Sequence, residues 1–167
     1  MAKLDLLKGM KVVDFSSYIA APTCAKLLGE YGAEVIRIEP NISDSVRFVA
    51  SQVYGCADGT NPLYDVINGN KRQICLNTRT PEGKDVLQRL IADADVFVCN
   101  LREAQAKRVG LDFETLHEKY PKLPLILHVS RIYRDARRLH GRGPYKDHLW
   151  LSLQPEAGTA SQLPAFW

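Results

Sequence analysis

The segment from residue 11 to residue 38 constrains the fold of this chain most strongly. Lys11–Phe15 is an apolar run that predicts a buried strand, and Glu34–Ile38 predicts a second one. Between them, Pro22–Tyr31 carries apolar residues at helical spacing and is followed by Gly32, a typical helix stop. A strand, a helix and a strand with such short connections predict a βαβ unit with a right-handed crossover and parallel strands.

The same alternation of strands and helices continues as far as residue 130. Further strands are predicted at Arg72–Leu76, Asp95–Cys99 and Leu125–Val129, and further helices at Asn61–Ile67, Pro81–Ala92, Glu103–Arg108 and Asp112–Glu118. Residues 40–60 lack periodicity and predict a long surface loop. We therefore expect residues 1–130 to form one α/β domain, with an open Rossmann-like parallel sheet and helices on both of its faces.

The order is lost in residues 131–167, which glycine and proline interrupt repeatedly. This segment has 6 Lys+Arg against 3 Asp+Glu and therefore accounts for the whole formal net charge of +3. We expect an irregular, solvated basic tail, with a sixth strand around Leu149–Leu153 as its one regular element. Nucleic-acid binding by these arginines is the weaker alternative, because no aromatic residues are interleaved with them for base stacking.

The composition favours a soluble globular protein. The chain has 167 residues, of which 46% are hydrophobic and 25% charged, and no apolar run approaches the roughly 20 residues that span a bilayer. The N-terminal residues lack the apolar core of a secretion signal, so we expect a cytoplasmic protein without a membrane segment. The cysteines and histidines lack metal-ligand spacing, so no metal site is expected. Cys75 and Cys99 lie in apolar runs and are predicted to be buried, reduced thiols.

Ligands of open parallel sheets bind at the carboxyl ends of the strands. The first such end here, Asp14–Pro22, has no G-x-G-x-x-G pattern, although Ala20 and Ala21 would let a ligand approach the backbone closely. Asp14 suggests either a catalytic acid or, preferably, a carboxylate that caps or hydrogen-bonds a neighbouring backbone, because a buried carboxylate needs partners.

Basic residues around the third predicted strand favour an anionic ligand. Lys71 and Arg72 precede this strand, and Arg79 follows it at the start of the helix that Pro81 begins. Together with the positive end of that helix, these three cations predict a place where a phosphate group docks. The alternatives are that Arg79 is an ordinary solvated residue and that Asn100, at the next strand end, only forms a turn.

Several segments in consecutive order resemble the class III CoA-transferases, the CaiB–BaiF family. They are residues 7–15, Ala21-Pro22, residues 32–40, Asp44–Arg47, residues 70–72, residues 79–83, residues 94–100 and residues 110–116. The resemblance covers residues 7–130 and is nearest to the branch acting on aryl-lactates and other 2-hydroxy acids. It implies that the chain binds CoA at the carboxyl ends of the strands and that its substrates are an acyl-CoA and a carboxylic acid.

The resemblance also assigns the CoA contacts by position. They are Tyr18, Ile19, Ala20, Leu76, Arg79, Asn100, Leu101 and Arg108. Pro40 stands where the family often has a basic residue, which weakens one corner of the implied nucleotide site. Members of the family are homodimers that move CoA from an acyl-CoA to a carboxylic acid through an aspartyl anhydride.

The family's nucleophilic aspartate lies in a Gly-Asp-x-x-x-Gly segment that would fall beyond Trp167, and Asp147 lacks the flanking glycines. We therefore expect a truncated family member without its catalytic residue. One hypothesis for the divergent residues 131–167 is a disturbed reading frame near Arg131. The alternative function is that of a non-catalytic fragment that binds CoA or another nucleotide.

Overall fold

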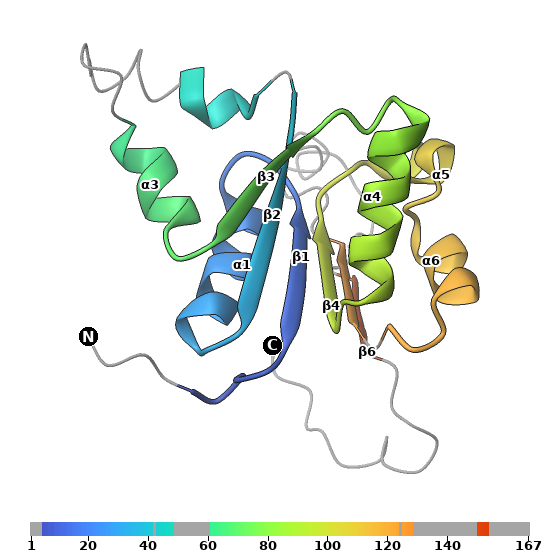
Figure 1. The fold of residues 1–167 in the computed structure, drawn as a ribbon, viewed down its shortest axis with the longest axis horizontal. Helices are drawn as coiled ribbons and strands as arrows, with labels where there is room; N and C mark the ends of the chain where they lie inside the picture. The colour runs from blue at the N-terminus through green and yellow to red at the C-terminus, as the bar shows by residue number, and fades with distance from the viewer. Residues whose placement is uncertain (1–4, 42, 49–60, 124, 129–149, 154–167) are drawn as a thin grey trace, which may run out of the picture.

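The computed structural model describes residues 5–41, 43–48, 61–123, 125–128 and 150–153 (Figure 1). Within these residues the strands are β1 Lys11–Phe15, β2 Glu34–Pro40, β3 Arg72–Leu76, β4 Val96–Cys99, β5 Leu125–His128 and β6 Trp150–Leu153. The helices are α1 Ala20–Glu30, α3 Pro62–Asn68, α4 Pro81–Ala92, α5 Glu103–Val109 and α6 Phe113–Lys119. A helical turn at residues 45–48 lies inside the stretch predicted as a surface loop.

The strands described form a six-stranded sheet in the order β3-β2-β1-β4-β5-β6. β1 pairs in parallel with both β2 and β4, β2 with β3, and β4 with β5, which confirms the predicted parallel sheet. β6 pairs antiparallel with β5, at the place where a sixth strand was predicted. The rest of residues 131–167 lies outside the described residues, as do the long loop's residues 49–60.

One face of the sheet is covered by α1. Val12, Val35 and Val98 point to this face and pack against Ala21 and Ala25 of the helix. The small alanine side chains let the helix backbone lie close to the strands. Figure 1 shows α3 on the same side, next to α1.

The other face is covered by α4 and α6. Val13, Ile38 and Phe97 point to this face, because neighbouring residues of a strand point to opposite sides, and they pack against Leu87 and Ile91 of α4. Helices therefore lie on both faces of the sheet, as predicted. None of the helices in the described part of the chain is long and apolar enough to cross a membrane.

The helix boundaries follow from local chemistry. Thr80 caps α4 by accepting a hydrogen bond from the Gly83 N–H, and Pro81 supplies the fixed φ of the first helical residue. α5 ends at Gly110, which adopts the left-handed φ of 70°. α1 starts at Ala20, two residues earlier than predicted. This earlier start brings the beginning of the helix directly to the end of the loop after β1.

Candidate functional site

The loop that follows β1 lies where the strand order reverses. From β1 the chain runs outward to β2 and β3, whereas β4 pairs with the opposite side of β1. Open α/β sheets bind ligands at the carboxyl ends of the strands next to such a point. Residues 16–19 form this loop here, and Asn100 directly follows β4 beside it.

Asn100 fastens the β1 loop to the end of β4. Its Oδ1 accepts a hydrogen bond from the Ser17 N–H at 3.0 Å, and its Nδ2 donates to the Ser17 carbonyl at 2.7 Å. Both halves of the amide are therefore engaged with the backbone of one residue. A ligand at this edge would meet an Asn100 side chain that already has protein partners, so this predicted CoA contact also shapes the loop.

Tyr18 is the most constrained residue of the loop. Its φ of 70° is left-handed, a conformation that bulky residues rarely adopt. Its N–H points at the carboxylate of Asp44, with both oxygens at 3.2 Å. Tyr18 and Ile19 are 47% and 39% exposed, and Ala20 begins α1 with no side chain of the described residues capping the helix. These three predicted CoA contacts thus present a largely open surface at a positive helix end.

Four buried charged side chains lie under this loop: Asp14, Arg37, Asp44 and Lys71. Each of the four side chains is fully buried. Arg37 donates to Asp14 Oδ2 at 3.2 Å and to Asp44 Oδ2, and Lys71 Nζ lies 2.9 Å from the same Asp14 oxygen. Two positive and two negative charges make the cluster neutral, as the burial of charge requires. Asp14 is thus a buried carboxylate with partners, as preferred from the sequence, but within the described residues these partners are side chains and not the neighbouring backbone that was expected.

The predicted phosphate dock of three cations does not form. Lys71 Nζ is held by Asp14, by the Pro22 carbonyl at 2.6 Å and by Asn68 Oδ1 at 2.9 Å. Burial lowers the pKa of Lys71, and the Asp14 carboxylate opposes this shift. Arg72 forms an exposed ion pair with Glu34 at the start of β2. Of the three, Arg79 alone is left at the carboxyl edge of the sheet.

Arg79 projects from a tight turn between β3 and α4. Leu76 ends β3 half-buried, and the Asn77 side chain accepts the Arg79 N–H at 3.2 Å. This connection packs closely against the first turn of α4. A Cβ added to Gly83 there would lie 2.1 Å from the Asn77 carbonyl oxygen. Arg79 itself is exposed, and its guanidinium has no hydrogen bond or ion pair within the described residues.

The remaining predicted contacts follow β4. Leu101 is half-buried, and Arg108 is exposed in the last turn of α5. Cys99, at the end of β4, is buried as predicted, and burial raises the pKa of its thiol to about 12. Cys75 is exposed, so its predicted burial was wrong: it lies in β3, the edge strand of the sheet, which is exposed at three of its five residues.

A second cluster of polar side chains fixes the chain after β2. Glu39 accepts hydrogen bonds from Arg47 Nε at 2.7 Å, from the Tyr64 hydroxyl at 2.7 Å and from the Asp44 N–H at 3.0 Å. Burial alone would raise the pKa of Glu39, but these bonds and one from Ser43 lower it to about 2. The Arg47 guanidinium stacks 3.6 Å from the centre of the Tyr64 ring. This cluster places Asp44 beneath Tyr18.

The sequence interpretation missed Asp44, which contacts the backbone of the predicted site, and Arg37, which pairs with it. A signal was present, because Asp14 and Arg37 interrupt two apolar strands that were predicted to be neighbours. Opposite charges in adjacent buried strands are expected to pair. In the described residues, no three His, Cys, Asp or Glu side chains are grouped to bind a metal.

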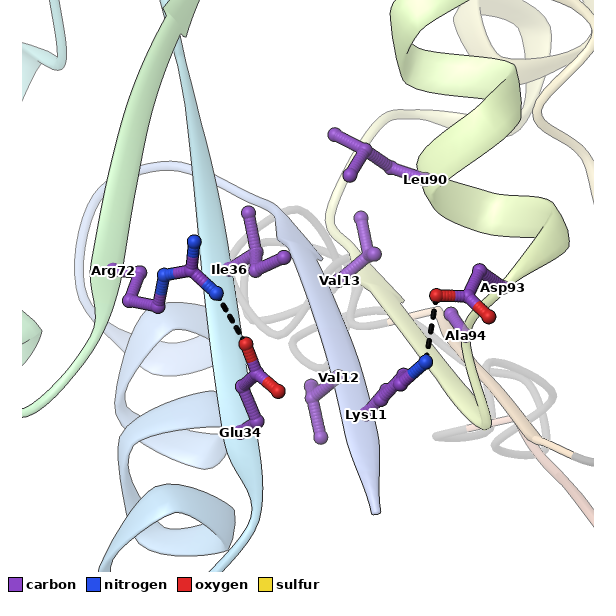
Figure 2. Close-up of a pocket in the computed structure, with 9 residues that line it drawn as sticks. All are labelled: Lys11, Val12, Val13, Glu34, Ile36, Arg72, Leu90, Asp93 and Ala94. Atoms are coloured by element: carbon purple, nitrogen blue, oxygen red, sulfur yellow. Dashed lines mark hydrogen bonds and ion pairs between the residues drawn. The ribbon is translucent and has the colours of Figure 1, made fainter. Parts of the chain in front are cut away.

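The pocket shown in Figure 2 lies elsewhere, on the α4 face near the amino ends of the strands. Its lining residues are Lys11, Val12, Val13, Glu34, Ile36, Arg72, Leu90, Asp93 and Ala94. Lys11 pairs with Asp93 at 2.7 Å and Arg72 with Glu34, so the charges on its rim are mutually neutralised. None of the eight predicted CoA contacts lines it. We therefore place the candidate site at the opposite, carboxyl edge of the sheet.

Comparison with known proteins adds to this geometry. The family model described as CoA-transferase family III matches residues 7–146. The (R)-2-hydroxy-4-methylpentanoate CoA-transferase of Clostridioides difficile is 39% identical over 143 residues, which are 85% of this chain and 34% of that protein. The cinnamoyl-CoA:phenyllactate CoA-transferase of Clostridium sporogenes is 39% identical over 144 residues, or 86% of this chain and 33% of that protein.

A solved structure has the same fold. The crystal structure of a CAIB/BAIF family protein from Brucella suis superimposes with a TM-score of 0.61 at 30% identity, covering 74% of this chain and 32% of that one. The chain thus spans about a third of the length of the relatives it matches.

Proposed function

The chain belongs to CoA-transferase family III, and on this premise we propose that it forms the CoA-binding part of a class III CoA-transferase. The reaction proposed is transfer of CoA between an acyl-CoA and a carboxylic acid through an aspartyl intermediate. The two similar clostridial enzymes are named for 2-hydroxy acids, which makes a 2-hydroxy acid the preferred acceptor.

The observation that carries this proposal is the fixed, open loop at the reversal of the strand order. Tyr18 and Ile19 are exposed there, and the beginning of α1 offers N–H groups that no described side chain caps. Arg79 and Arg108 are both exposed, and each guanidinium is suited to bind two phosphate oxygens at once. CoA carries phosphates at its nucleotide end, so this edge would receive that end of the molecule.

CoA binding tests the proposal directly. Titration calorimetry and thermal shift on the 167-residue chain should show CoA binding and an increase in Tm with CoA concentration. Arg79→Ala and Arg108→Ala should each weaken binding about tenfold, the loss typical of one charge-assisted contact. Arg72→Ala is the matched control, because Arg72 is also an exposed arginine but lies at the opposite edge of the sheet. Equal effects of all three variants would place CoA elsewhere.

A second candidate function is CoA binding without turnover. It concerns the 167 residues taken alone, which hold no Gly-Asp-x-x-x-Gly segment. An assay with an acyl-CoA donor and a 2-hydroxy-acid acceptor separates the two functions. CoA binding with no turnover would support the second candidate, whereas clear turnover would show that a nucleophile lies within residues 1–167.

A further inference from the structure

The conformation of Tyr18 needs an explanation that its own side chain does not provide. Its φ of 70° is unfavourable for an L-residue, because Cβ then crowds the backbone carbonyl. Tyr18 is 47% exposed, so burial of the residue alone does not account for this conformation. What does hold the residue is its N–H, which lies 3.2 Å from each Asp44 carboxylate oxygen.

Asp44 is itself rigidly placed. Its backbone N–H donates to Glu39 Oε1 at 3.0 Å, and its Oδ1 accepts the Val46 N–H at 3.0 Å, as a cap of the helical turn at residues 45–48. Its other oxygen pairs with the guanidinium of Arg37, which is completely buried. The carboxylate is therefore fixed by the strand β2 on one side and by its own loop on the other.

The rest of the charge cluster makes this placement depend on the sheet register. Arg37 lies opposite Asp14 in the β1–β2 ladder and bridges Asp14 and Asp44. Lys71 supplies the second positive charge from the start of β3. Two strands and the residue before a third thus contribute to holding the Asp44 carboxylate under the β1 loop. Asn100, directly after β4, holds the backbone of Ser17.

We propose that Asp44 is a positioning residue for CoA binding: the neutral cluster of Asp14, Arg37, Asp44 and Lys71 holds Tyr18 in its left-handed conformation, and this presents Tyr18, Ile19 and Ala20 to the nucleotide end of CoA. The inference rests on the proposed function and adds to it the residue that sets the shape of the site. Asp44 touches the backbone of the loop from below and acts through Tyr18.

The test compares Asp44→Ala in three backgrounds: the parent, Tyr18→Ala and Tyr18→Gly. Alanine removes the tyrosine side chain but keeps Cβ, whereas glycine populates positive and negative φ about equally. Asp44→Ala should weaken CoA binding about tenfold in the parent and in the Tyr18→Ala background, the shift expected when a left-handed L-residue is released. In the Tyr18→Gly background the loss should be about threefold or less. Equal losses in the alanine and glycine backgrounds would overturn the proposal.

Amide hydrogen exchange at residue 18 provides a readout that is independent of CoA. The Tyr18 N–H should be protected in the parent and should exchange rapidly in Asp44→Ala, while the Val13 N–H in the central strand stays protected in both. An unchanged Tyr18 rate would overturn the positioning role. If the parent shows no CoA binding, the proposed function fails, and the exchange rates still decide whether Asp44 holds Tyr18.

Asp44→Ala leaves Arg37 buried with one partner fewer, which can prevent folding. The double variant Arg37→Met/Asp44→Ala avoids this unpaired charge, because it removes one charge of each sign and keeps the ion pair of Asp14 and Lys71. This double variant should show the same pattern across the parent, Tyr18→Ala and Tyr18→Gly backgrounds. If either Asp44→Ala or the double variant folds and binds CoA as tightly as the parent, the inference is wrong.

Discussion

Replacing Glu39 with glutamine should remove a specific part of the pH dependence of stability. Glu39 is 8% exposed and binds Arg47, Tyr64 and the backbone of Asp44, which together hold its pKa at about 2, against an ordinary value of 4.5. The carboxylate is stabilised in the folded protein, so its contribution is present in full above the pKa of the unfolded chain. It is lost as the pH falls through the folded value.

The size of the effect follows from the pKa difference. Each pKa unit corresponds to about 1.4 kcal/mol, so the ionised Glu39 contributes about 3 kcal/mol to the free energy of unfolding at pH 7. At pH 3 the unfolded group is protonated while much of the folded group is still ionised, and about 1 kcal/mol remains. The stability difference between the parent and Glu39→Gln should therefore shrink by about 2 kcal/mol between these pH values.

Urea unfolding of both proteins, in steps from pH 7 to pH 3, measures this difference. Comparing the two proteins at each pH cancels the titration of all other carboxylates. Arg47→Ala serves as the control variant, because it removes the first hydrogen-bond partner of Glu39 and should also flatten the dependence. A stability difference between the parent and Glu39→Gln that stays constant over this range would refute the reasoning.

Three further predictions concern stability at neutral pH. Gly83→Ala places a Cβ 2.1 Å from the Asn77 carbonyl oxygen and should cost about 2 kcal/mol in urea unfolding, whereas the exposed Lys84→Ala on the same helix should change stability by less than about 0.5 kcal/mol. Phe97→Ala removes a fully buried ring from β4 and should cost about 3–5 kcal/mol in the same assay; a smaller loss would mean that the core collapses around it. Thr80→Ala removes the cap of α4 and should lower Tm, at a cost of about 1 kcal/mol, unless another group satisfies the Gly83 N–H.

The framework of the fold could be predicted because its signals are local. The apolar run at β1, the helical spacing of α1 and the Thr-Pro start of α4 each specify their element without help from distant residues. Short connections then require parallel strands, and the observed sheet has them. The antiparallel direction of β6 has no local signal, because it depends on how the chain returns to β5.

The candidate site was harder to predict because it depends on register. Lys71 and Arg79 bracket the same strand and look equivalent in the sequence. Lys71 instead turns inward: it precedes β3, which pairs with β2, and its long side chain reaches the buried Asp14 of β1. The role of Asp44 was missed for the same reason, since its partners lie in three separate segments.

The central place of β1 also has a consequence for how the chain matures. Lys11 and Asp95 bond to each other across 84 positions, so one flank of the first strand stays vacant until β4 has been made. A ribosome adding about 5–20 residues per second needs roughly 4 to 17 s for that distance. During this interval the nascent βαβ unit exposes an unpaired, apolar edge of β1. Misassembly should be most frequent at this stage, and a chaperone should be most useful then.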